Sequence, residues 1–286
     1  MVLLVRFGEL ALKSRYVRRQ LRDRLVANIQ DLFAAEGVEC ITEADEARVY
    51  VHTEDAGRAR AILARVFGIV SMSPAVETKA DLESITALAL RESRVALESG
   101  MSFALRPRRA GTHPFTSQDL ARAVGETIRT SIPGVRVDLT NPDVEIHLEA
   151  RQNRAFVFRE IWKGPGGLPL GSQGRALAFV HDEAGMVAAW MAMKRGCRVT
   201  IAAPDDGAFV DPLHRWDVRL KVLKASSASD FAECLRIARA EALFLGTRWE
   251  TFRPEGRPAV PVPVFEPIIG LSDAEIAGEA RHIRSG

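Results

Sequence analysis

The chain has 286 residues, of which 47% are hydrophobic and 27% are charged, a composition typical of a globular protein with about two or three domains. Its formal net charge is only +2, so overall charge does not attract nucleic acid, and any nucleic-acid site needs a local cluster of cations. The three cysteines, Cys40, Cys197 and Cys234, form no Cys-x-x-Cys pair. This argues against a disulfide framework and against a zinc site, and it favours the cytoplasm.

Membrane insertion is not expected either. The longest apolar run, residues 184–193, is far shorter than the roughly 20 residues that a membrane-spanning helix needs. Arg6, Glu9 and Lys13 interrupt the N-terminal segment, so it lacks the apolar stretch of a signal peptide. We therefore expect a cytoplasmic protein with no membrane partner.

Residues 1–78 show strand and helix patterns in the order β-α-β-β-α-β, which is the ferredoxin-like pattern. Strands are expected at residues 2–7, 38–42, 48–53 and 69–77, and helices at residues 16–33 and 55–66. Gly37 and Gly68 end the two helices.

Cations crowd the first of these helices and its approach. The candidate phosphate contacts are Lys13, Arg15, Arg18, Arg19 and Arg22, and the four arginines fall at spacings of three and four that share one helix face. A solvated surface explains many lone basic helices. Like charges at these spacings repel, however, and a purely structural helix usually interleaves acids. We interpret the cluster as a phosphate-binding face.

Residues 79–165 predict a second α+β domain in the order α-β-α-β-β-β. The helices are expected at residues 82–97 and 116–131, and the strands at residues 101–106, 135–139, 144–150 and 155–161. Thr116 and Asp119 form a variant of the capping box at the start of the second helix. A basic loop with Arg106, Arg108 and Arg109 follows the first strand, and arginine forks suit phosphate.

Two further polar residues lie near that loop. His113 and Ser117 are close enough in sequence to join a phosphate or ribose contact, although a lone loop histidine is more often incidental. The alternative for the arginines is surface solubility. Trp162, which precedes a glycine-rich hinge, is interpreted as packing between domains.

From residue 172 onward the patterns predict an α/β domain with a parallel sheet, opened by a strand at 176–180, a turn, and a helix that stops at Gly196. Further elements are a strand at 198–203, a helix at 230–240, a strand at 242–246, an edge strand near Val264, and a last helix that starts at Ser272. An exposed acidic loop with Asp205, Asp206 and Asp211 is favoured over a metal site.

Several motifs in order resemble the tRNA 4-thiouridine synthetase (ThiI) family, which is also linked to thiamine biosynthesis. The segments are Phe-Gly-Glu-Leu-Ala-Leu-Lys-Ser at 7–14, Arg-Pro-Arg-Arg-Ala-Gly-x-His-Pro-Phe-Thr-Ser at 106–117, Val-Asp-Leu-Thr-Asn-Pro-Asp at 137–143, Gly-Gly-Leu-Pro-Leu-Gly-Ser at 166–172 and Pro-Ile-Ile-Gly-Leu-Ser at 267–272. The resemblance implies a ferredoxin-like domain at 1–78, a THUMP domain at 79–165 that grips the tRNA acceptor end, and a Rossmann-like PP-loop (ATP pyrophosphatase) domain at 172–286.

The resemblance fails at the phosphate loop. The family carries Ser-Gly-Gly-x-Asp-Ser there, and this chain has Val180, His181, Asp182, Glu183, Ala184 and Gly185. A like-charge contact with phosphate at 4 Å costs about 1 kcal/mol in water and about 4 kcal/mol at an effective dielectric of 20. We therefore expect Asp182 and Glu183 to cap the helix rather than to hold a metal, and the PP-loop domain to be a shortened remnant.

The resulting hypothesis is a tRNA-binding protein, a pseudo-enzyme with no catalytic residue, metal or cofactor, whose Cys234 has no catalytic role. One alternative is an active tRNA sulfurtransferase or another tRNA-modifying enzyme, with ATP bound in another way or chemistry supplied by a partner. The other is a scaffold that docks a sulfur carrier or a tRNA-modifying protein. A homodimer is left open.

Overall fold

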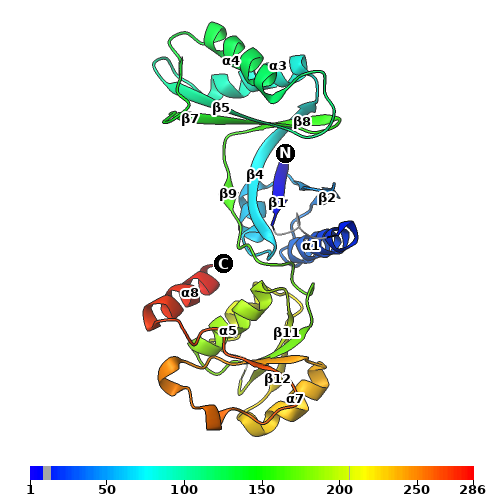
Figure 1. Ribbon diagram of the computed structural model, residues 1–286, viewed down its shortest axis with the longest axis vertical. Coiled ribbons are helices and arrows are strands. Elements are labelled where there is room, and N and C mark those ends of the chain that lie inside the picture. Colours follow the sequence, from blue (N-terminus) through cyan, green and yellow to red (C-terminus); the bar gives the residue numbers. More distant parts are fainter. Residues whose placement is uncertain (9–13, 206) are drawn as a thin grey trace. The chain divides into compact units, whose positions relative to one another are not determined.

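The computed structural model describes residues 1–8, 14–205 and 207–286 (Figure 1). Contacts divide the chain into two compact units. The first contains Met1–Leu4, Val51–Thr53 and Met72–Trp162, and the second contains Val5–Tyr50, Glu54–Ser71 and Lys163–Gly286.

The first unit is built on a sheet whose strands hydrogen bond in the order β4-β8-β7-β5-β6. Its elements are β4 (Ile69–Lys79), α3 (Leu82–Ala96), β5 (Ser102–Arg109), α4 (Ser117–Ser131), β6 (Arg136–Val137), β7 (Val144–Ala150) and β8 (Arg154–Phe158). α3 and α4 lie side by side on one face (Figure 1), and apolar residues of both helices pack there against Phe103, Ile146 and Leu148. The predicted capping box is present, because Thr116 Oγ1 accepts from the Asp119 backbone at 3.2 Å and the Asp119 carboxylate accepts from the Thr116 backbone at 2.9 Å.

One expectation for this unit is wrong. Arg106, Arg108 and Arg109 lie within β5 and not in a loop, because β5 pairs in parallel with β7 from Phe103 to Arg109. On its other side β5 meets β6 only at Ser102 and Phe103. Pro107 therefore has a free edge where its missing N–H costs no ladder bond, and the strand continues through it.

The N-terminal strands hydrogen bond in the order β2-β3-β1-β4. The elements are β1 (Val2–Phe7), α1 (Arg15–Ala35), β2 (Ile41–Ala44), β3 (Val49–His52) and α2 (Ala56–Leu63). The strand expected at 38–42 begins at Ile41. α1 ends in a Schellman motif, with Gly37 at a φ of +63° and the Val38 N–H donating to the Phe33 carbonyl at 3.0 Å, so Val38 is used to close the helix.

The C-terminal part of the second unit is a fully parallel sheet in the order β12-β11-β10-β13-β14, as the sequence predicts. Its elements are β10 (Arg175–Phe179), α5 (Glu183–Lys194), β11 (Arg198–Ala203), α6 (Asp211–His214), β12 (Lys221–Lys224), α7 (Phe231–Ala238), β13 (Ala242–Phe244), β14 (Val264–Phe265) and α8 (Asp273–Ser285). The two-residue strand β9 (Trp162–Lys163) pairs with β4. α5 and α8 cover one face of the parallel sheet and α7 covers the other (Figure 1).

An aromatic cluster joins the two parts of the second unit. Phe67, which follows α2, stacks on Trp216 with ring centroids 5.1 Å apart and meets Trp190 edge-on at 5.4 Å. All three side chains are almost fully buried. The buried Arg65 pairs with Glu36 at 2.5 Å and donates to the Arg215 carbonyl at 3.1 Å. Segments 54–71 and 163–286 therefore share one core.

Candidate functional site

The turn between β10 and α5 leads into the first helix of the parallel sheet. Val180 is buried, and the half-exposed His181 ring stacks on Phe179 with centroids 4.7 Å apart. Asp182 is the N-cap, as expected, and its Oδ1 accepts from the Gly185 N–H at 2.7 Å. One of the free N–H groups of this helix end is thereby occupied by the chain's own carboxylate.

Two further contacts lie at the start of this helix. Glu183 forms an ion pair with Arg284 of α8 at 2.7 Å. A Cβ added to Gly246, just after β13, would lie only 2.3 Å from the Gly185 nitrogen, so backbone presses directly on the first turn of α5. β10 and β13 are neighbours where the strand order reverses, and ligands of open α/β sheets bind at such a point. Here the backbone at Gly246 lies against the helix end at that point.

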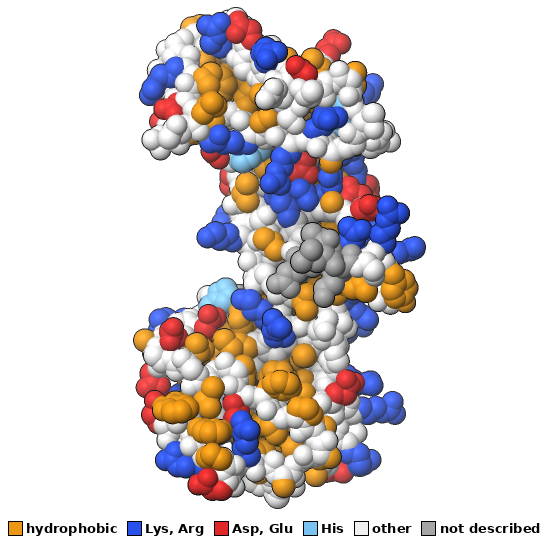
Figure 2. All heavy atoms as spheres, in the orientation of Figure 1, with side chains coloured by type: hydrophobic (Ala, Val, Ile, Leu, Met, Phe, Trp, Pro, Cys, Tyr) orange, Lys and Arg blue, Asp and Glu red, His pale blue; other side chains and the backbone are white. Residues whose placement is uncertain are grey.

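The α1 arginines gather as expected. Arg15, Arg18, Arg19 and Arg22 line a cavity of about 270 Å³ together with Glu46, and Lys and Arg side chains cluster over this helix (Figure 2). Arg22 pairs with Asp23 at 2.7 Å, and Arg19 lies 3.8 Å from the same carboxylate. Lys13, the fifth predicted phosphate contact, and most of the 7–14 motif lie outside the described residues.

The three arginines of β5 differ in how free their side chains are to contact phosphate. Arg106 pairs with Glu145 at 2.5 Å and donates to the Leu139 carbonyl at 3.1 Å. Arg108 and Arg109 are exposed, and within the described part of the chain Arg109 donates only to a nearby backbone carbonyl, that of Gly111. Arg106 and Arg108 are two residues apart in the strand and share a face of the sheet, whereas Arg109 points to the other face.

The two polar residues near these arginines have local roles. His113 is half-buried, and its Nε2 lies 2.8 Å from the Arg151 carbonyl, which makes Nε2 the donor. Ser117 is the first residue of α4. The Trp162 indole donates to Glu160 at 2.8 Å. His113 is therefore held by the fold rather than presented to solvent.

The cysteines are not activated nucleophiles. Cys234 lies buried on α7, and burial raises the pKa of its thiol, with Asp230 and Glu233 adding to the rise. Burial likewise raises the thiol pKa of Cys40 and of Cys197. A raised pKa leaves the thiol protonated at neutral pH, whereas nucleophilic attack and metal binding need the thiolate.

Two negative findings concern only the described residues. Among residues 1–8, 14–205 and 207–286, no group of three His, Cys, Asp or Glu side chains is placed to hold a metal ion. No described helix combines the length and the apolar composition that a membrane span requires.

Comparison with known proteins decides the family. Residues 2–73 match the ThiI ferredoxin-like domain and residues 79–160 match the THUMP domain. A probable tRNA sulfurtransferase of Methanothermobacter thermautotrophicus is 40% identical over 215 residues, which are 73% of this chain and 54% of that protein. The chain belongs to the ThiI family. A probable tRNA sulfurtransferase of Methanosarcina acetivorans is 42% identical over 205 residues, 70% of this chain and 50% of that protein.

The chain spans about half the length of these curated ThiI-family relatives. A different relative matches throughout. The crystal structure of PH1313 from Pyrococcus horikoshii has a TM-score of 0.84 and 31% identity, and the match covers 99% of both chains. A 4-thiouridine synthetase solved as an RNA complex with bound ATP shares the fold, with a TM-score of 0.79 at 18% identity over 99% of this chain and 85% of that one.

Sequence reasoning missed two residues that shape this ThiI-family fold. Gly246 directly follows an apolar strand, and its sequence context does not reveal that its backbone meets α5. Arg284 lies 101 positions from Glu183, so no local pattern links them. The cap at Asp182, by contrast, was predicted because it depends only on its neighbours.

Proposed function

We propose that this protein binds tRNA at the acceptor end and does not adenylate it. In this proposal residues 79–165 are the THUMP domain that grips the RNA, residues 1–78 add phosphate contacts from α1, and residues 172–286 are a shortened PP-loop domain without the ATP motif. The protein is then a cytoplasmic pseudo-enzyme of the ThiI family.

The proposed absence of adenylation rests on the contacts at the N-terminal end of α5. A helix N-terminus binds phosphate when its N–H groups are free and its positive end is unanswered. Here Asp182 accepts from the first turn, Glu183 is paired with Arg284, and the backbone at Gly246 lies against the same turn. These contacts support a helix end that has no room for the phosphates of ATP.

The RNA half is supported by the domain match and by the arginines. The THUMP match covers residues 79–160, and a fold relative was solved with RNA. Arg15 and Arg18 on α1 and Arg108 and Arg109 on β5 make no ion pair with any described residue, which leaves their charges available to phosphate. Arg106 is a weaker candidate for a phosphate contact because it already forms an ion pair with Glu145.

A tRNA binder without its own chemistry needs another protein to act on the bound tRNA. We propose that a sulfur carrier or a tRNA-modifying protein docks on residues 172–286. A second copy of the chain is a further candidate partner. Co-purification of a protein that modifies the bound tRNA is the observation that supports docking.

The acceptor-end proposal makes a direct binding prediction. A hairpin that reproduces only the acceptor stem and its single-stranded 3′ end should bind with the same affinity as whole tRNA, because the proposed contacts all lie there. Fluorescence anisotropy with labelled RNAs measures both constants under one salt condition, as salt sets phosphate-driven affinity. A hairpin of the anticodon arm is the matched control and should bind at least tenfold more weakly. Equal binding of the two hairpins would contradict acceptor-end recognition.

A further inference from the structure

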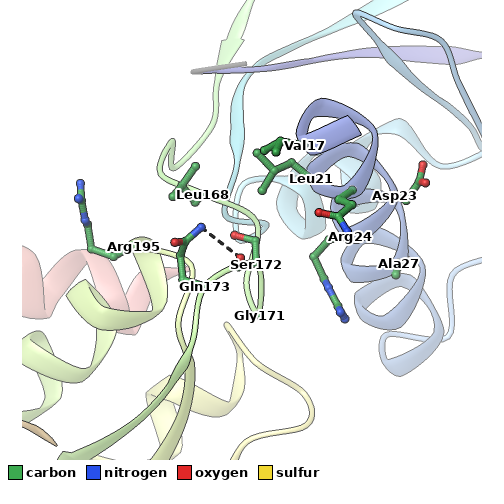
Figure 3. A pocket seen from close by; sticks show the side chains of 11 residues that line it. Val17, Leu21, Asp23, Arg24, Ala27, Leu168, Gly171, Ser172, Gln173 and Arg195 are labelled. Carbon is green, nitrogen blue, oxygen red and sulfur yellow. Dashed lines mark hydrogen bonds between the residues drawn. The ribbon is translucent and has the colours of Figure 1, made fainter. Parts of the chain in front are cut away.

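The second unit contains a larger cavity that none of the proposed contacts uses. It measures about 800 Å³ and lies between α1 and the segment 168–173, next to the end of α5 (Figure 3). Its volume falls within the range of about 300–1,000 Å³ that is typical of small-ligand sites. The face of α1 that lines it carries Val17, Arg24 and Ala27 and is distinct from the face that carries Arg15, Arg18 and Arg22.

Two arginine side chains without an ion-pair partner among the described residues line the cavity. Arg24 on α1 and Arg195 at the end of α5 are exposed and lie on opposite sides of it (Figure 3). Neither side chain makes an ion pair or a hydrogen bond with any residue in the described part of the chain. Nearby arginines of the same unit are paired, since Arg198 contacts Asp217 at 2.9 Å and Arg219 contacts Asp31 at 2.5 Å. Two guanidinium groups are thus left for an anionic ligand.

Asp23, the acidic residue that lines the cavity, does not neutralise the charges of Arg24 and Arg195. Asp23 accepts both a 3.0 Å and a 2.7 Å hydrogen bond from the Arg22 guanidinium, so its charge is already answered by an arginine outside this cavity. A carboxylate held in this way repels a bound anion much less than a free one.

The remaining walls suit a planar polar group. Val17 and Leu21 of α1 supply apolar surface on one side and Leu168 supplies it on the other (Figure 3). Gln20 and Gln173 bring side-chain amides. One N–H of each is used within the chain, because Gln20 donates to the Tyr16 hydroxyl at 2.8 Å and Gln173 donates to the Ser172 carbonyl at 3.1 Å, and the described residues leave a second N–H and a carbonyl oxygen of each for a ligand. Ser172 lines the same space, but its Oγ is buried away from solvent and is not a contact for a ligand in the cavity.

We propose that this cavity takes one unpaired nucleotide of a bound RNA. The apolar walls enclose the base, the two amides contact its polar edge, and Arg24 and Arg195 hold the phosphates on either side. The inference rests on the proposed RNA binding and adds to it a site for single-stranded RNA, apart from the arginines of β5 and of the opposite α1 face.

The test compares two RNA hairpins with the same stem, one blunt-ended and one with four unpaired nucleotides at its 3′ end. The double variant Q173A/R195A should lose about tenfold or more in affinity for the extended hairpin, because a hydrogen bond to a charged group is removed. Its affinity for the blunt hairpin should stay within about twofold. Both residues are exposed, so thermal denaturation should match wild type. Arg281→Ala, which removes an exposed arginine from α8 outside the cavity, is the control and should affect neither hairpin.

The outcomes separate the cavity from the wider proposal. Equal losses for both hairpins would overturn the nucleotide site, since Arg195 would then act only through its general charge. Unchanged binding of both hairpins would also overturn it. If wild type binds neither hairpin, the proposed RNA binding itself fails together with the cavity.

Discussion

Replacing Arg108 and Arg109 by alanine should flatten the salt dependence of tRNA binding. Each phosphate contact contributes roughly −0.7 to −0.9 to the slope of log affinity against log salt. Both arginines are exposed and lack an ion-pair partner among the described residues, so the double variant should change the slope by about 1.5 units and weaken binding at low salt. Adding Arg106→Ala should change the slope by less than the roughly 0.7 to 0.9 of one full phosphate contact, because Glu145 already pairs with Arg106.

The same experiment contains its own controls. Arg129→Ala removes an arginine that is paired with Glu126 on α4 of the same unit, and its slope should equal that of wild type. Thermal stability should change little in all variants, since exposed arginines contribute little to folding. A double variant with an unchanged slope would mean that the β5 arginines only solvate the surface, and RNA binding would then rest on the family match.

Phe67→Ala should destabilise the second unit strongly. Truncating a fully buried phenylalanine removes apolar contacts and leaves a cavity, at a cost of about 3–5 kcal/mol. Phe67 packs on both Trp190 and Trp216, so the loss affects the contact between segment 54–71 and the parallel-sheet part. The thermal midpoint, followed by tryptophan fluorescence, should fall by about 10 °C.

Tyr16→Ala is the matched control for this variant, because Tyr16 is 70% exposed and its removal should shift the midpoint by a degree or two at most. If Phe67→Ala melts like wild type, the aromatic cluster does not hold the unit together. In that case the N-terminal segments and residues 163–286 would be energetically independent, despite their shared core.

The sequence predicted those parts of the fold that depend on near neighbours. α4 and α8 begin where Thr116 and Ser272 predicted, because a capping box needs only four consecutive residues. β11 has the bounds that its apolar run indicated. β12 was missed because it places only Val222 and Leu223 between two lysines at the edge of the sheet, where few contacts demand apolar residues.

Long-range contacts explain the remaining differences. Arg106, Arg108 and Arg109 continue β5 because β7, some 40 residues later, offers them a pairing partner. The face shared by the α1 arginines was predictable from spacing, whereas the cavity between α1 and residues 168–173 was not, since it depends on how distant segments pack. The close contact between the Gly246 backbone and the first turn of α5 also depends on long-range packing, so it was not predictable from the sequence.

The protein, as proposed, holds tRNA and has no ATP site. Isothermal titration calorimetry of ATP with magnesium into the protein, alone and saturated with tRNA, tests this proposal most directly. Asp182 occupies the Gly185 N–H and the Gly246 backbone lies against the first turn of α5, so we predict no binding heat in either titration. A micromolar dissociation constant in either titration would contradict the account and favour an active tRNA-modifying enzyme.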